Sequence, residues 1–163
     1  MNKPKYVIVV GLDYSRASER ALDEAFALGC SKHGVQMHVV NVRSAPEETT
    51  APNEPVLPPW EYWAAELRDF VARKAAAFQA TEGRAPFQHV YTHQRLNDPA
   101  HQITQLATDV EADLVVVGTH DWHGVSRPMP GSVAEAVTRL APCPVLVVHR
   151  KVPPSSAPAT RPT

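Results

Sequence analysis

Residues 113–150 read DLVVVGTHDWHGVSRPMPGSVAEAVTRLAPCPVLVVHR, and this segment alone carries the pattern of two strands and a helix. An apolar run from Leu114 to Val117 stops at Gly118, and a polar loop follows as far as Ser132. Apolar residues then recur at helical spacing, and a second apolar run extends from Val145 to Val148. Strand, loop, helix and strand in this order predict a βαβ unit, with the loop at the carboxyl end of a buried parallel strand.

The loop of this unit has the chemistry of an anion-binding site. Gly118 and Gly131 can adopt backbone angles that other residues avoid, and they let a ligand approach the main chain. Ser132 begins a helix, where unpaired N–H groups and the positive end of the helix dipole favour a phosphate. The same residues also form a capping box, because Glu135 follows Ser132 by three positions. Capping requires no ligand, and from these residues alone it is the favoured explanation.

Length, composition and charge predict a single domain that binds neither nucleic acid nor membranes. The chain has 163 residues and a net charge of −1, so no basic excess favours either partner. No apolar run approaches the length of a transmembrane helix and no signal peptide is recognisable, so we expect a cytoplasmic protein. Cys30 and Cys143 lack metal-type spacing and are expected to be reduced thiols in the core. We expect one domain over residues 1–150 and a disordered, proline-rich tail over residues 151–163.

The segments before residue 113 continue the alternation of strands and helices. Short apolar runs predict strands at residues 6–10, 37–42 and 87–92. Helical spacing and capping residues predict a helix capped by Ser15, a helix that begins near Trp60, and a helix that starts at Asp98 and Pro99. The order βαβαβαβαβ predicts an α/β fold: a doubly wound, five-stranded parallel sheet with helices on both faces, Rossmann-like.

By analogy with such folds, we expect the strand order 3-2-1-4-5. This order brings the turn after the first strand, residues 11–15, next to the loop after the fourth strand, residues 118–132. Ligands of doubly wound sheets bind at this point, where the winding reverses. The expected binding site is therefore the crevice between strands one and four.

The helical periodicity also predicts which side chains are buried. In the helix near Trp60, the buried stripe is expected to include Trp60, Trp63 and Leu67. The two tryptophans could instead anchor a partner surface, although a core-facing role is favoured. In the last helix, apolar residues recur at helical spacing, at Val133, Ala136, Val137, Leu140 and Ala141.

Several segments, taken in order, resemble the universal stress protein family. They are residues 13–22 (DYSRASERAL), 39–42 (VVNV), 97–100 (NDPA), 112–120 (ADLVVVGTH), 131–135 (GSVAE) and 141–148 (APCPVLVV). The resemblance covers about residues 5–150, and the set in this order is highly specific. It implies a stress-response protein, and it implies a homodimer joined through the last strand.

The ATP-binding members of that family carry the motif Gly-x2-Gly-x9-Gly-Ser/Thr. The resemblance places the first glycine at Gly118, the last at Gly131 and the hydroxyl at Ser132, but Asp121 stands where the middle glycine is expected. A carboxylate beside a triphosphate costs on the order of 1 kcal/mol or more unless a metal ion intervenes. The motif is therefore intact where it meets the last helix and altered where it turns at Asp121.

The resemblance thus implies a degenerate site for an adenine nucleotide, ATP with Mg or Mn. Asp13 and a second-strand residue near Val40 are expected to hold the adenine. Arg127 is either a phosphate contact or a solvated surface residue, and Pro128 and Pro130 each remove an N–H group from the loop. The candidate cofactor-binding residues are Asp13, Val40, Gly118, Thr119, His120, Asp121, Gly124, Arg127, Gly131, Ser132 and Val133.

No catalytic residue is assigned, so at most slow ATP hydrolysis is expected. His120, Asp121 and His123 could ligate a divalent metal for a hydrolase, but a solvated loop is the favoured explanation. The apolar last strand, from Val145 to Val148, is expected at a sheet edge and predicts an antiparallel two-fold contact near Val147.

Two functions remain open from the sequence. The first is a dimeric cytoplasmic stress-response protein that binds an adenine nucleotide in the crevice. The second is a stress-response protein that binds no nucleotide and acts through protein contacts. Its surface would be the long loop 43–59 and the start of the helix at Trp60 and Trp63.

Overall fold

The computed structural model describes residues 6–44, 60–119 and 132–149 of the chain. Within them, five strands form one sheet in the order β3-β2-β1-β4-β5, and every pair of neighbouring strands is parallel. The predicted strand order and fold class are therefore confirmed. The elements are β1 (Tyr6–Gly11), α1 (Arg16–Cys30), β2 (Val35–Arg43), α2 (Trp60–Glu82), β3 (His89–Leu96), α3 (Pro99–Asp109), β4 (Leu114–Thr119), α4 (Val133–Leu140) and β5 (Val145–His149).

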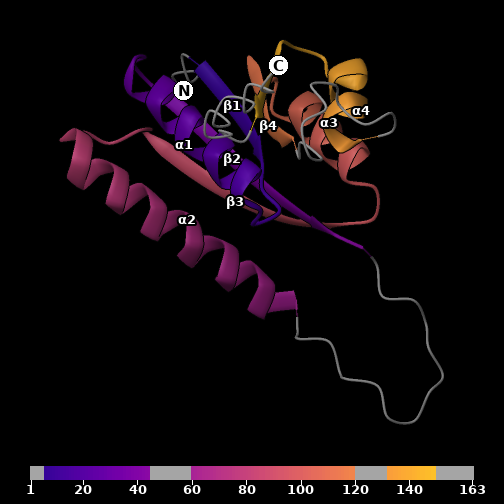
Figure 1. The fold of residues 1–163 in the computed structure, drawn as a ribbon, viewed down its shortest axis with the longest axis horizontal. Coiled ribbons are helices and arrows are strands. Elements are labelled where there is room, and N and C mark those ends of the chain that lie inside the picture. Colours follow the sequence, from indigo (N-terminus) through magenta and orange to yellow (C-terminus); the bar gives the residue numbers. More distant parts are fainter. Residues whose placement is uncertain (1–5, 45–59, 120–131, 150–163) are drawn as a thin grey trace, which may run out of the picture.

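The helices cover the two faces of the sheet in pairs. Figure 1 shows α1 and α2 on one side of the strands and α3 and α4 on the other. This arrangement follows from right-handed crossovers between parallel strands, which place a helix on one face or the other according to the direction of winding. The winding reverses between β1 and β4, as expected for a doubly wound sheet.

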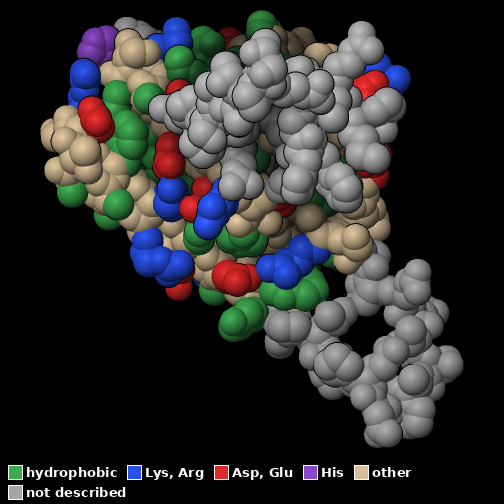
Figure 2. Space-filling view, viewed as in Figure 1, with side chains coloured by type: hydrophobic (Ala, Val, Ile, Leu, Met, Phe, Trp, Pro, Cys, Tyr) green, Lys and Arg blue, Asp and Glu red, His purple; other side chains and the backbone are tan. Residues whose placement is uncertain are grey.

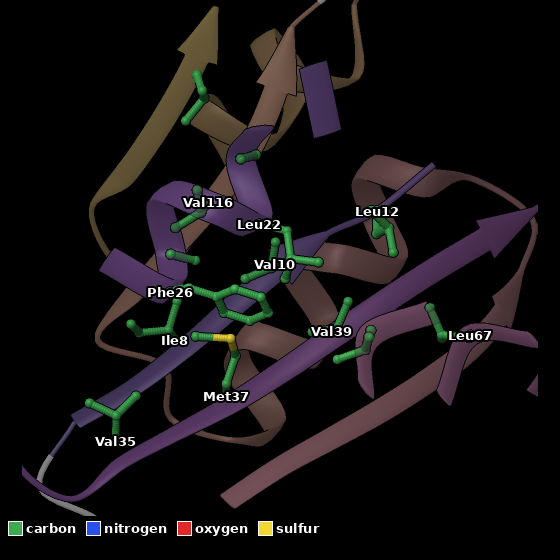
Figure 3. Packing of buried hydrophobic residues seen from close by; sticks show 14 residues of the cluster. Ile8, Val10, Leu12, Leu22, Phe26, Val35, Met37, Val39, Leu67 and Val116 are labelled. Carbon is green, nitrogen blue, oxygen red and sulfur yellow. The ribbon is translucent and has the colours of Figure 1, made fainter. Parts of the chain in front are cut away.

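The larger core lies between the sheet and the pair α1 and α2. Phe26 of α1 is fully buried, and Figure 3 shows its ring beside Ile8 of β1 and Met37 of β2. Leu67 of α2 enters the same cluster from the flank of the sheet. Burial of a side chain such as Phe26 contributes roughly 1.5–3 kcal/mol to folding, so this cluster fixes α1 on the central strands.

The second core lies between the sheet and the pair α3 and α4. Val9 and Val115 from the central strands meet Ile103 and Leu106 of α3 and Val137 of α4, and all five are at most 4% exposed. The central strands are buried on both faces, which explains their almost continuous runs of valine.

The predicted helix starts are confirmed by their hydrogen bonds. Ser15, Asp98 and Ser132 have extended backbone angles, and each side chain accepts a hydrogen bond from a backbone N–H in the first turn of its helix. Pro99 occupies the first turn of α3. These contacts satisfy N–H groups that a helix leaves unpaired at its start.

The predicted bounds of two strands were wrong. β2 begins at Val35, directly after Gly34 with φ 70°, and not at residue 37. β3 spans His89–Leu96 and not residues 87–92. Phe87 suggested a strand because it is apolar, but it packs before β3 against the first core. The polar end of β3 continues to pair with β2 as far as Arg43 and Leu96.

Some predicted burial was also wrong. Trp63 is 8% exposed as expected, but Trp60 is 43% exposed. Trp60 stands at the first position of α2, where fewer neighbouring side chains cover it. Cys30 and Cys143 are free thiols, as expected, but both are only partly buried.

The surface of the described residues mixes both signs of charge. Figure 2 shows Lys and Arg side chains interspersed with Asp and Glu on the face that carries α2. Lys74 of α2 lies 2.9 Å from a carboxylate oxygen of Asp23, and Arg43 lies 2.9 Å from Glu66. Among the helices that the structure describes, none has the length and apolarity needed to cross a membrane.

Candidate functional site

The crevice predicted from the winding lies where the carboxyl ends of β1 and β4 meet the start of α1. The two strands pair in register from Ile8 and Leu114 to Val10 and Val116. Beyond this pairing, Gly118 lies against the backbone of Ala17 and Ser18, and a Cβ placed at Gly118 would lie 2.5 Å from the nitrogen of Ser18. The turn after β1 and the end of β4 are therefore side by side, and Gly118 is needed for this close packing.

The contact gives Gly118 a function that sequence reasoning missed. The pattern of a phosphate-binding loop explains this glycine by the approach of a ligand, whereas here the start of a helix approaches it. The tight fit sets the height of the α1 N-terminus above the sheet. It thereby positions the turn of Asp13, which precedes that helix directly.

The turn of Asp13 is held by its own side chains. A carboxylate oxygen of Asp13 accepts a hydrogen bond from the Ser15 N–H at 3.0 Å, and the Asp13 N–H donates to Ser18 Oγ at 3.2 Å. Tyr14 has φ 62°, a left-handed conformation that is uncommon outside glycine. Its ring packs edge-on against Phe70 of α2, with centroids 5.1 Å apart. Asp13 itself is exposed.

Val40 is placed differently from Asp13. Its side chain is 1% exposed and belongs to the core under α3, and its carbonyl oxygen accepts a hydrogen bond from the Leu12 N–H at 2.9 Å. Val40 therefore supports the turn after β1, and its contact with a nucleotide stays a prediction.

A polar bridge beside Val40 was not anticipated from the sequence. Asn41 Nδ2 donates a hydrogen bond to the Leu12 carbonyl at 2.7 Å, and Gln94 Nε2 donates to Asn41 Oδ1 at 2.9 Å. Asn41 is 3% exposed and Gln94 is 9% exposed. The bridge ties the end of β1 to β2 and β3. The signal for it was present, since Asn41 interrupts an otherwise apolar run.

Ser132 caps α4. Its Oγ accepts a hydrogen bond from the Glu135 N–H at 3.2 Å, which confirms the capping interpretation. Thr119 ends β4 and is 3% exposed, whereas Val133 is exposed at the first position of α4. The cap occupies the N–H of Glu135, and the earlier N–H groups of a helix also lack acceptors within the helix.

Much of the predicted loop lies outside the described residues. This applies to His120, Asp121, His123, Gly124, Arg127 and Gly131, and likewise to the loop 45–59 and the tail 151–163. Their proposed contacts therefore stay predictions. Within the part of the chain that the structure describes, no group of three or more His, Cys, Asp or Glu side chains is arranged to hold a metal ion.

A second cluster lies where β2 ends beneath the start of α2. The guanidinium of Arg43 pairs with Glu66 and lies 4.9 Å from the centroid of the Trp63 ring, a cation–π contact. Burial, and after it the Glu66 carboxylate, raise the pKa of the Tyr14 phenol above its ordinary value. Trp60 and Tyr62 stand outside this cluster and are exposed. At the start of α2, the contact between Arg43 and Trp63 thus lies beside two exposed aromatic rings.

Comparison with known proteins identifies the family. The model of the universal stress protein family matches residues 6–149. The chain belongs to the universal stress protein family. The resemblance seen in the sequence is therefore confirmed, and it extends over almost the whole described domain.

Individual proteins of the family are similar in length and fold. The universal stress protein YxiE of Bacillus subtilis is 28% identical over 148 residues, which cover 87% of this chain and 97% of that protein. A universal stress protein solved in complex with cAMP is 24% identical, with a TM-score of 0.59 over 88% of this chain and 96% of that one. A family member from Arabidopsis thaliana with AMP bound is 15% identical, with a TM-score of 0.59 over 93% and 97%. At these identities, the two structures show a shared fold.

Proposed function

We propose that this universal stress protein is a dimeric, cytoplasmic stress-response protein that binds an adenine nucleotide in the crevice between β1 and β4. The observation that carries the proposal is the contact of Gly118 with Ala17 and Ser18, since it brings the Asp13 turn and the end of β4 to one place. Two proteins of the same fold are described with cAMP and with AMP bound, which supports an adenine nucleotide as the class of ligand.

The expected roles of the residues follow from their positions. The exposed carboxylate of Asp13 would accept hydrogen bonds from the sugar or base of the nucleotide. The start of α4 at Ser132 and Val133 would face the phosphates, because a helix N-terminus favours an anion. The proposed ligand is ATP with Mg or Mn, and at most slow hydrolysis of the bound ATP is expected.

Titration of the purified full chain with ATP tests this proposal. Calorimetry and thermal-shift measurements, with and without Mg²⁺ or Mn²⁺, are expected to show saturable binding. Stabilisation must then grow with the ratio of free ligand to Kd, as linkage requires. An absence of both heat and thermal shift at millimolar ATP, AMP and cAMP would reject nucleotide binding.

The Asp121→Gly variant sharpens the test, since it restores the glycine of the family motif. Removal of the carboxylate is expected to tighten ATP binding by about tenfold, because one like charge near the phosphates is lost. AMP carries fewer charges, so it should gain less. An unchanged affinity for ATP would show that Asp121 does not face the phosphates.

The homodimer is proposed through β5. This strand pairs only with β4 within the described residues, and Val145, Leu146 and Val147 are only partly buried. Such an edge favours pairing with another strand. Light scattering is expected to give a dimer at micromolar concentration and a monomer for Val147→Arg. Val90→Arg on β3 is the matched control at the opposite edge and should remain dimeric.

The exposed aromatic residues at the start of α2 favour a second candidate function. Trp60 is 43% exposed and Tyr62 is 59% exposed. The ring of Trp60 contacts that of Trp63, which in turn contacts Arg43. Aromatic side chains of this kind are enriched in protein interfaces. In this alternative, the protein binds no nucleotide and acts through protein contacts at α2. Nucleotide titration separates the two candidates directly.

A further inference from the structure

Polar rings gather on the flank of the sheet formed by β2 and β3, away from the crevice. His38 of β2 stands in register with Tyr91 of β3, and Val40 with His93. The ring of His38 lies 5.0 Å from that of Tyr91, with 22° between the planes. β3 is the edge strand, and Tyr91 is 46% exposed, yet His38 is only 5% exposed. The buried imidazole of His38 therefore lies next to an exposed residue of the edge strand.

Two hydrogen bonds determine where the protons of the histidines sit. Gln36 Nε2 lies 3.0 Å from His38 Nε2, and His38 Nδ1 lies 2.9 Å from His93 Nε2. An amide nitrogen only donates, so His38 Nε2 accepts and His38 Nδ1 carries the proton. His38 therefore donates to His93 Nε2, and the proton of neutral His93 is on Nδ1. Both rings are neutral in this chain of bonds.

The arrangement of the two rings favours a shared hydrogen bond over a metal ion. Their centroids are 5.1 Å apart with 16° between the planes. A nitrogen–nitrogen distance of 2.9 Å spans that separation when the rings lie nearly edge to edge. The two nitrogens then face each other along one line, as a single proton between them requires.

Added protons are incompatible with this chain of bonds. A proton on His38 Nε2 would face the Gln36 amide donor, and a proton on His93 Nε2 would face the His38 N–H. When both rings are charged, the pair has no acceptor nitrogen at all, and the two charges repel. Since His38 is buried, its charged form also loses hydration.

The other groups on this face do not compensate for such charges. β3 contributes His89, Tyr91 and Arg95, and α3 contributes Asp109, while β1 contributes apolar valines. Asp109 is already 3.6 Å from the Arg95 guanidinium. The Tyr91 ring could attract a charged His38 weakly, but Arg95 opposes a charge on His93.

We propose that the bonds joining Gln36, His38 and His93 form a proton-operated latch, which holds the edge strand β3 on β2 at neutral pH and releases it in acid. Release would uncover the hydrogen-bonding edge of β2 and loosen α2, which packs against β3. The latch lies apart from the crevice, so it operates whether or not a nucleotide binds.

The direction of the pH dependence follows from proton linkage. Burial, followed by repulsion from a protonated His93, lowers the pKa of His38 from 6.5 to about 4, and burial also lowers the pKa of His93. When β3 is released, the histidines bind protons below pH 6.5. In the closed sheet they do not bind protons until the pH is much lower. Closure is therefore fully stable above pH 6.5 and weakens as the pH falls towards 4. From His38 alone, the opening equilibrium at pH 5 increases by about 30-fold.

Amide hydrogen exchange of the full chain measures this opening. Between pH 7.5 and pH 5, protection factors of the β3 amides are expected to fall by about 30-fold relative to those of β1 and β4. His38→Leu removes the ring that donates to His93 and should reduce the fall to the part that His93 alone contributes. His101→Leu, which removes an exposed histidine from α3, is the matched control and should preserve it.

Two results would overturn the latch. One is an equal fall in β3 protection in wild type and His38→Leu, and the other is a wild-type β3 whose protection does not change with pH. Should His38→Leu not fold, NMR titration of the wild-type imidazoles decides. A latch requires His38 to stay neutral at pH 5 in the closed protein. Protonation of His38 near pH 6.5 with β3 still protected would refute it.

Discussion

The seam between β1 and β4 and the seam between β2 and β3 are held together by different chemistry. At the first seam, valines pair in register and the backbone of α1 presses on Gly118, with no space for a side chain. At the second seam, Asn41 binds Gln94 and His38 binds His93 through hydrogen bonds between side chains. The first seam is sensitive to volume, and the second is sensitive to protons and to lost partners.

This difference separates two tasks within one sheet. The central seam places the Asp13 turn, and it needs a fixed geometry, which close packing provides. The flank seam binds an edge strand that carries polar residues on both faces, so its stability depends on complete hydrogen bonding. Variants at each seam should therefore fail in different ways.

The largest effect is expected from Gly118→Ala. Its Cβ would meet the backbone of Ala17 and Ser18, which cannot move without shifting α1, and we expect a loss of about 3 kcal/mol in the free energy of unfolding. Gly83→Ala is the control, because Gly83 has φ 73° but no atom within 4 Å of an added Cβ. It should lose only about 1 kcal/mol through backbone strain. Urea denaturation compares the two variants. Equal losses in the free energy of unfolding would show that the backbone around Gly118 makes room for a Cβ at little cost.

A smaller loss is expected from Asn41→Ala at the flank seam. The change leaves the Leu12 carbonyl and the Gln94 amide without their partner in a buried place, which costs about 2 kcal/mol. A double-mutant cycle with Gln94→Leu isolates the bond between the two side chains, with an expected coupling of about 1 kcal/mol. Additive losses in urea denaturation would mean that Asn41 acts through Leu12 alone.

The central seam could be predicted from the sequence, because its residues follow simple periodic patterns. Apolar runs such as Leu114 to Val117 are typical of strands buried on both faces, and Ser15, Asp98 and Ser132 mark helix starts by short-range hydrogen bonds. These patterns gave the order of elements. The strand order came from analogy with doubly wound folds, and the structure confirmed it.

The flank seam could not be predicted in the same way. β3 is polar along most of its length, so its bounds were wrong, and the partners of His38 and Asn41 are 55 and 53 residues away in the chain. No local pattern shows which distant polar groups meet. The packing function of Gly118 was missed for the same reason, since Ala17 and Ser18 lie far from it in the sequence, before β2, α2, β3 and α3.

The smallest change in stability is expected from Ser132→Asp, which separates capping from phosphate binding. Aspartate caps a helix about as well as serine, and its charge is favourable at a helix N-terminus, so unfolding should change by less than about 0.5 kcal/mol. A phosphate at the same place would be repelled, and ATP affinity should fall by at least about tenfold.

Ser132→Ala completes the comparison by removing the cap without adding charge. It should lose about 1 kcal/mol in the free energy of unfolding, because the Glu135 N–H loses its acceptor, while ATP affinity should change much less than with aspartate. Thermal denaturation gives the first quantity and calorimetric titration the second. If ATP binds equally well to the aspartate variant and to wild type, the start of α4 serves the fold alone, and any nucleotide is held on the side of Asp13.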